Sequence, residues 1–210
     1  MNAGQVATSD GRLFHAPDMR RLEARAKRLS RQLARQRRGS GRRERTRIRL
    51  AKTRRGIAGI RRDWRHRVSR RIADSAYLVA VEDLRVEAMT RSAWGTVEEP
   101  GSRVRQKAGL NRVVSDTGWA QLRALLDYKA GRLMAVPAHD TSRTCAACGH
   151  IDAASRRSQA VLHCAACNHI THVDANAARN IRRRGLTLLH GEAAASSGPA
   201  NRENTSKAAA

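Results

Sequence analysis

Cys145-Ala-Ala-Cys148 and Cys164-Ala-Ala-Cys167 are the two stretches that decide how this chain folds, and they contain all four of its cysteines. A Cys-x2-Cys pair forms a tight knuckle that directs two thiolates at one point, and an intervening hairpin can bring a second pair to the first. Gly149 directly follows the first pair, where a residue that accepts positive φ is useful. The spacing predicts a zinc ribbon over about residues 141–170. The four predicted Zn²⁺ ligands are Cys145, Cys148, Cys164 and Cys167.

Two disulfides are the alternative interpretation of these cysteines. Disulfides belong to oxidising compartments, and the first residues of this basic chain show no signal-peptide pattern. Zinc is therefore favoured. A shell of four thiolates leaves no open coordination position for a substrate, so the predicted zinc is structural.

Charge is the second strong signal. The 210 residues carry a net charge of +24, and the segment from Arg20 to Arg71 alone holds 23 Lys/Arg against three acidic residues. Like charges at i, i+4 oppose helix formation, so binding to phosphates explains this excess better than two solvated helix faces do. No apolar run reaches the ~18 residues that a membrane span needs. The composition predicts a soluble, cytoplasmic protein that binds nucleic acid and no membrane.

A β-hairpin and a helical hairpin are predicted in the first third of the chain. Asp10-Gly11 is a strong turn signal between two short extended runs. Apolar residues spaced by three and four then predict two antiparallel helices over about residues 17–76, broken at Gly39-Ser40-Gly41, with arginines outward. The arginines predicted to contact nucleic acid are Arg35, Arg37, Arg38, Arg42, Arg43, Arg54, Arg55, Arg61 and Arg62.

The middle of the chain is predicted to alternate strands and a helix. The apolar run 77–81 predicts a buried strand that ends at Glu82, and 133–136 predicts another. Residues 90–109 are polar and contain glycine, which predicts a surface loop. Asp116 is interpreted as the N-cap of a helix that ends near Gly131.

Asp174 opens the last predicted helix, which runs to about Arg184, and residues 187–210 are predicted to be a disordered tail. An Asp at a helix start is most often an N-cap. A carboxylate such as Glu82, at the C-terminal end of a buried strand, either closes the strand or faces a functional crevice. Neither carboxylate decides the function alone.

Five runs in a fixed order carry a family resemblance. They are Val79-Ala-Val-Glu-Asp-Leu84, Gly109-Leu-Asn-Arg112 through Gly118-Trp119, Leu125-Leu-Asp-Tyr-Lys-Ala130, Thr141-Ser-Arg-Thr-Cys-Ala-Ala-Cys-Gly149 and Asp174-Ala-Asn-Ala-Ala-Arg-Asn-Ile181. Together they resemble the C-terminal half of the OrfB/TnpB family of insertion-sequence proteins, relatives of the type V CRISPR effectors. The resemblance implies a RuvC-like nuclease of RNase H fold. Members of the family have traditionally been described as transposases and act as RNA-guided DNA endonucleases.

The resemblance also implies a metal site in which three carboxylates hold two Mg²⁺ ions. Glu82 matches the glutamate of the family's second motif, and Asp174 matches the aspartate of the third. Asn176 and Arg179 are candidates to face phosphate near this site. The family's first motif, Gly-x-Asp-x-Gly, has no counterpart in the chain, and Asp10 lies in a turn and does not replace its aspartate. We therefore expect a fragment truncated at its N-terminus, of marginal stability and with impaired cleavage.

These observations predict an α/β fold: a partial RNase H-like (RuvC) sheet with a long basic helical hairpin and an inserted zinc ribbon. The predicted divisions are a RuvC-like core with the hairpin over residues 1–140, the ribbon over 141–170, a closing helix over 171–186 and the tail. The predicted function is that of a TnpB-like endonuclease fragment that binds DNA and guide RNA, with a role in transposition or DNA recombination. The alternative is a non-catalytic zinc-ribbon protein that binds nucleic acid.

Overall fold

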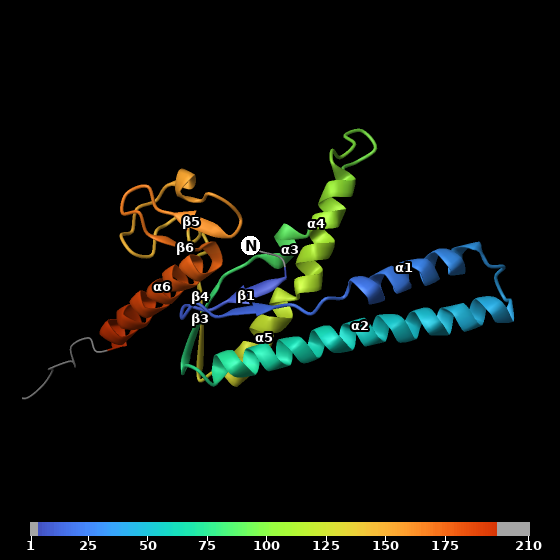
Figure 1. Cartoon of the computed structure of the whole chain (residues 1–210), viewed down its shortest axis with the longest axis horizontal. Helices are drawn as coiled ribbons and strands as arrows, with labels where there is room; N and C mark the ends of the chain where they lie inside the picture. The colour runs from blue at the N-terminus through green and yellow to red at the C-terminus, as the bar shows by residue number, and fades with distance from the viewer. Residues whose placement is uncertain (1–3, 197–210) are drawn as a thin grey trace, which may run out of the picture.

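The chain folds into three small sheets surrounded by helices. The computed structural model describes the backbone of residues 4–196 and the side chains of residues 4–191. Within that part, the strands pair as β1 with β2, β3 with β4 and β5 with β6, and one isolated bridge joins Leu162 of β5 to Arg156 (Figure 1). This mixture of helices and strands confirms the predicted α/β class.

The first sheet is the predicted hairpin. Strand β1 (Gln5–Ala7) runs antiparallel to β2 (Leu13–His15). The turn between them needs Gly11, which has a φ of +90°. The carboxylate of Asp10 accepts a hydrogen bond from the Thr8 hydroxyl and an ion pair from Arg12 at 2.6 Å, so the turn's own residues engage it.

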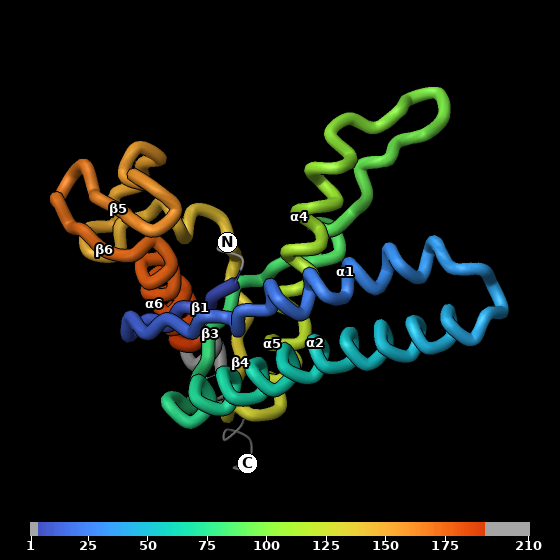
Figure 2. The backbone as a smooth tube through the Cα atoms, turned by 45° about the vertical axis from the view of Figure 1, so that its right-hand side comes forward, coloured from blue at the N-terminus to red at the C-terminus, as the bar shows by residue number. Residues whose placement is uncertain are grey.

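The predicted helical hairpin consists of α1 (Arg20–Arg35) and α2 (Gly41–Ala73). Ser40 caps α2 by accepting from the backbone N–H of Arg43 at 3.2 Å. With 33 residues, α2 is about 50 Å long. It packs antiparallel along α1, and the far part of both helices extends away from the body (Figures 1 and 2).

A buried stripe holds the far part of the hairpin together. Along α2 it consists of Thr46, Leu50, Thr53 and Ile57, spaced by three and four. Both threonine hydroxyls donate to the carbonyl four residues earlier, which satisfies them inside the stripe. The buried stripe ends at Ile57, because Ile60, three residues further along, is 39% exposed.

The near part of α2 belongs to the main core. Val68 and Ile72 pack with residues of β1, β3 and α5 (Trp119–Lys129). Strand β3 (Leu78–Glu82) runs parallel to β4 (Arg132–Val136), and Glu82 stands opposite Val136. Both predicted strands are confirmed.

The segment between β3 and α5 differs from the prediction. Residues 90–109 are not all loop: α3 (Val86–Met89) precedes them, and α4 (Val104–Thr117) begins within them. Asp116 is not an N-cap, because it lies in the last turn of α4 and accepts an ion pair from Arg61 at 2.6 Å. Gly118, with a φ of +68°, separates α4 from α5.

Helix α6 (Val173–Ser196) is longer than predicted. Gly185 does not end it, because this glycine is buried against β3: a Cβ there would lie 2.6 Å from the Cβ of Ala80. Residues 187–196 of the predicted tail are therefore helical, and residues 197–210 lie outside the described residues. No helix within residues 4–196 has the length and apolar character needed to cross a membrane.

Candidate functional site

The four cysteines converge on one point. Their Sγ atoms all lie within 4.8 Å of one another, with Cys145 to Cys167 at 3.8 Å and Cys148 to Cys164 at 3.6 Å. All four are free thiols, so the disulfide alternative is wrong. A tetrahedral ion with bonds of about 2.3 Å places its sulfur ligands about 3.8 Å apart. The cluster therefore fits a metal ion held by four thiolates.

Two matching knuckles build this cluster. The backbone N–H of Gly149 donates to Cys145 O at 2.9 Å, and that of Asn168 donates to Cys164 O at 3.0 Å. Both donors have positive φ, +80° at Gly149 and +56° at Asn168. This confirms the role expected for Gly149, and it shows that Asn, which tolerates this conformation, serves the second knuckle. Strands β5 (Val161–His163) and β6 (Ile170–His172) bring the knuckles together.

The thiols do not ionise independently. The backbone N–H of Cys167 is the main cause that lowers the pKa of Cys164 to about 6, against the opposing effect of burial. The backbone N–H of His169 lowers the pKa of Cys167. The hydrogen bond with the Cys148 thiol, burial and the hydrogen bonds with the other two sulfurs have a larger, opposite effect and raise this pKa to about 12. Four sulfurs this close need a cation among them before all can be thiolates.

The two predicted carboxylates line one cavity of about 1310 Å³. Glu82, the last residue of β3, is half-buried and accepts from the Thr141 hydroxyl at 2.7 Å. Asp174, in the first turn of α6, is half-buried and accepts from the Gln5 side-chain amide at 2.5 Å. The structure therefore places these two acidic residues, 92 positions apart in sequence, on the lining of the same cavity.

The same cavity separates two sheets. Residues 5–8, in and just after β1, and residues 78–82 of β3 line it. Within residues 4–196, neither strand has a hydrogen-bonded neighbour beyond its single partner. Each therefore keeps one edge with unpaired backbone groups.

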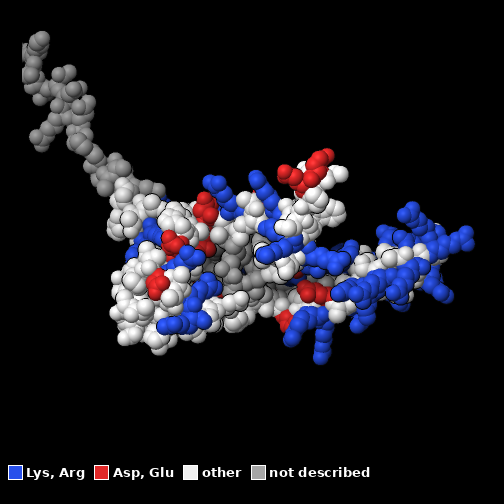
Figure 3. Space-filling model, turned by 90° about the horizontal axis from the view of Figure 1, so that it is seen from above, with Lys and Arg blue, Asp and Glu red and all other residues white. Residues whose placement is uncertain are grey.

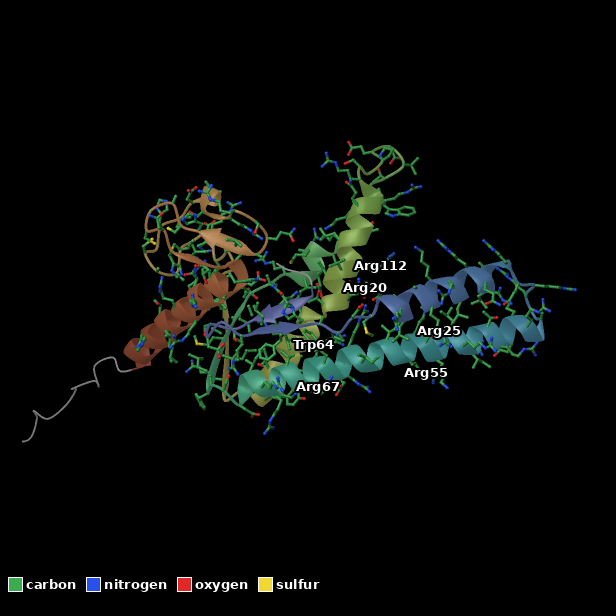
Figure 4. The ribbon with its side chains drawn as sticks, in the orientation of Figure 1. Arg20, Arg25, Arg55, Trp64, Arg67 and Arg112 are labelled. Atoms are coloured by element: carbon green, nitrogen blue, oxygen red, sulfur yellow. The ribbon has the colours of Figure 1, made fainter. Side chains whose placement is uncertain are left out.

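The helical hairpin carries most of the charge. Residues 28–55 contain 13 Lys/Arg and one acidic residue, a net charge of +12. Lys and Arg side chains crowd this projecting part (Figure 3). Arg25 extends from α1, and Arg55 and Arg67 extend from α2 (Figure 4).

Seven of the nine predicted arginines are exposed, and their side chains make no hydrogen bond or ion pair within the described residues. They are Arg35, Arg37, Arg38, Arg42, Arg54, Arg55 and Arg62. A row of exposed, uncompensated guanidinium groups is suited to binding a polyanion.

The other two predicted arginines have partners within the chain. Arg43 is half-buried and caps α1 by donating to the carbonyls of Leu33 and Gln36. Arg61 is 22% exposed and pairs with Glu23 at 2.7 Å and with Asp116 at 2.6 Å. Their guanidinium groups thus join elements of the fold.

Four polar residues near the carboxylates were not predicted in their observed roles. Gln5 and Thr141 contact the carboxylates directly. Asn176 and Asn180 are 0% and 4% exposed and bind backbone groups of residues 141–146. Asn176 therefore does not face phosphate. The i, i+4 spacing of the two asparagines, which places them on one face of the helix, is the sequence signal that could have shown this.

Two family models and several curated proteins match this chain. Residues 4–93 match the OrfB_IS605 family, described as "Probable transposase", and residues 119–181 match the Cas12f1-like TNB domain. InsQ of Escherichia coli K12, whose name denotes a candidate RNA-guided DNA endonuclease, is 36% identical over 94% of this chain and 50% of its own length. The CRISPR-associated endodeoxyribonuclease Cas12f1 of Sulfoacidibacillus thermotolerans is 31% identical over 60% of this chain and 27% of its own.

A solved structure of a Cas12f1–sgRNA–target DNA complex matches with a TM-score of 0.45 and 18% identity, covering 85% of this chain and 48% of that one. The chain thus spans half or less of the length of these proteins. The two family models match its two ends, the first over the β-hairpin, the helical hairpin and β3, the second over the cysteine cluster and Asp174. The chain belongs to the TnpB (OrfB) family of insertion-sequence proteins.

Proposed function

We propose that this chain is the RuvC-like and zinc-ribbon part of a TnpB-type RNA-guided DNA endonuclease, acting on DNA with a guide RNA. The observation that carries the proposal is that Glu82 and Asp174 line one cavity. The names of InsQ and Cas12f1 support the reaction and its substrate, and a role in transposition follows from the family description.

The proposed fold is a partial RNase H-like sheet. Its support is that β1 and β3, each with one unpaired edge, line the same cavity and that α6 packs against both strands. An additional strand between them would join two separate pairs into one continuous sheet. The proposed divisions are the core with its hairpin over residues 1–140, the ribbon over 141–170 and the closing helix. This helix corresponds to α6, which ends later than the predicted residue 186.

Glu82 and Asp174 are the proposed Mg²⁺ ligands. Carboxylate oxygens are the donors that Mg²⁺ prefers, and the ion would supply an activated water and charge neutralisation at the phosphodiester. Thr141 orients Glu82, and Gln5 holds one oxygen of Asp174. The resemblance implies a third carboxylate in this site, the aspartate of the Gly-x-Asp-x-Gly motif, which has no counterpart in the sequence. We propose that Mg²⁺ binds weakly and that cleavage by this chain alone is slow.

Zn²⁺ is the proposed ion of the cysteine cluster, because the sulfur separations match its tetrahedral geometry. Free thiols held this close are typical of a reducing compartment, so we extend the proposal to the cytoplasm. The exposed arginines of the hairpin are the proposed contacts to the phosphates of DNA and guide RNA.

A direct test measures Mn²⁺, a spectroscopic substitute for Mg²⁺, by electron paramagnetic resonance. Wild type is expected to bind one or more ions weakly, and Glu82→Gln or Asp174→Asn is expected to lower the affinity at least about tenfold through loss of a ligand charge. Glu98→Gln, in an exposed loop, is the matched control. Equal binding by all four proteins would favour the alternative, a non-catalytic zinc-ribbon protein that binds nucleic acid through its hairpin.

A further inference from the structure

A buried polar network connects the first cysteine knuckle to helix α6. The Asn176 side chain accepts from the backbone N–H of Ala146 at 2.8 Å and donates to the carbonyl of Thr144 at 2.7 Å. These two backbone groups flank Cys145, whose side chain is fully buried in the cluster. Asn176 thus fixes the backbone on both sides of one metal ligand.

One turn later on α6, Asn180 continues the network. Its amide donates to the carbonyls of Thr141 at 2.9 Å and Thr144 at 2.7 Å. Its Oδ1 atom is buried and has no partner within the described residues, so these two donated bonds alone set the orientation of the amide. Asn180 therefore holds the start of the ribbon against α6.

Thr141 carries the network to the first carboxylate. It is 3% exposed, and its hydroxyl donates to Glu82 at 2.7 Å while its own carbonyl is held by Asn180. The second carboxylate is connected to the same network through the helix, because Asp174 lies two residues before Asn176 on α6. The segment 141–146 contains the metal ligand Cys145 near one end. Its other end contacts Glu82 through Thr141, and the segment also contacts α6, the helix that carries Asp174.

We propose that Thr141, Asn176 and Asn180 are positioning residues that couple the cysteine cluster to the carboxylate pair, so that a metal ion on the four thiolates raises the affinity of Glu82 and Asp174 for a divalent cation. This inference rests on the proposed function. Its physical basis is that groups which orient metal ligands typically change metal affinity by about 10–100-fold when they are removed.

The test uses the whole chain loaded with Co²⁺ at the cysteines, whose thiolate absorption reports that cluster, together with Mn²⁺ affinity and the melting temperature. Thr141→Val keeps the side-chain shape and removes only the hydroxyl. It is expected to lower the Mn²⁺ affinity about tenfold without changing the Co²⁺ spectrum. A modest fall in the melting temperature is expected as well, because the same hydroxyl also contacts the carbonyl of Ala138 at 3.1 Å. Thr141→Ser is expected to restore the affinity. Thr187→Val, on the exposed face of α6, is the matched control.

Removal of the metal from the cysteines tests the coupling itself. Stripped wild type is expected to lose at least about tenfold in Mn²⁺ affinity. Asn180→Leu is expected to bind Mn²⁺ weakly already, so stripping it should add little. The coupling would be overturned if the Mn²⁺ affinity stayed unchanged both in the stripped wild type and in Thr141→Val, while Glu82→Gln still weakened Mn²⁺ binding. If Glu82→Gln also had no effect, the proposed function and the coupling would fall together.

Discussion

Gly185 of α6 and Ala80 of β3 are in direct contact, and the spacing leaves no room for a methyl group. A Cβ at Gly185 would lie 2.6 Å from the Cβ of Ala80. The helix that carries Asp174 therefore reaches the strand that carries Glu82 through a position where only glycine fits.

Gly185→Ala is expected to lower the free energy of unfolding by about 1–3 kcal/mol, because overpacking outweighs the better helix propensity of alanine. Chemical denaturation measures this. Gly56→Ala is the control: Gly56 lies in α2 with nothing within 4 Å of a Cβ, so alanine should stabilise by about 0.5–1 kcal/mol. Stabilisation in both variants would show that α6 can move away from β3 at little cost.

Arg65→Met is expected to stabilise the chain by about 1–2 kcal/mol. Arg65 is 8% exposed, and its side chain makes no hydrogen bond or ion pair within the described residues. Burial, and then the charge of Arg61, lower its pKa, so its charge is unfavourable in the folded state. Urea denaturation at neutral pH checks the direction. The exposed neighbour Arg62, changed to Met, should leave stability nearly unaltered, and a loss of stability in Arg65→Met would mean that the guanidinium has a favourable role.

The exposed arginines predict strong salt dependence of nucleic-acid binding. Arg54→Gln with Arg55→Gln should reduce the slope of log affinity against log salt by about two, because each phosphate contact releases about one counterion. Fluorescence anisotropy with a labelled duplex gives this slope. Arg47→Gln serves as the comparison, since Arg47 already pairs with Glu44 at 2.6 Å. An unaltered slope in the double variant would remove these two residues from the interface.

Acid is expected to release the metal from the cysteine cluster. Without metal the pKa of Cys164 is lowered to about 6, and a coordinated metal ion lowers the pKa of a thiol further, so protons compete with the metal only as the pH falls below 6. The Co²⁺–thiolate absorption should therefore decrease as the pH falls below about 6, together with the melting temperature. Cys145→Ser should show the same loss at neutral pH. Retention of the absorption at pH 4 would contradict the assignment.

A strand supplied at the N-terminus should complete the sheet. Fusion of a segment that carries the family's Gly-x-Asp-x-Gly motif is expected to raise both the melting temperature and the Mn²⁺ affinity, because it pairs free strand edges and adds a carboxylate. The same segment with Asn in place of Asp should raise only the melting temperature. No change with either segment would argue against the proposed RNase H-like arrangement.

The parts of the fold that the sequence predicts well are those decided by local chemistry. The Asp-Gly turn, the break at residues 39–41 and the Cys-x2-Cys knuckles each need particular residue types, and each is confirmed. The two strands after α2 were also recognisable, because an unbroken apolar run is typical of a buried strand.

The errors arose where tertiary contacts decide. The last helix was predicted to end at about Arg184, but it continues through Gly185, which contacts Ala80. Asp116 reads as an N-cap but pairs with Arg61, a residue 55 positions earlier. Asn176 reads as a phosphate contact but binds the knuckle. In each case the residue type allowed two roles, and the choice depended on a partner that is distant in the sequence.

The bond from Gln5 to Asp174 has a consequence for how an ion could arrive. One oxygen of that carboxylate is already taken by a neutral amide at the beginning of the first hairpin. An incoming cation can therefore bind only the other oxygen of Asp174 while Gln5 stays in place, and a contact with both oxygens requires β1 to give way.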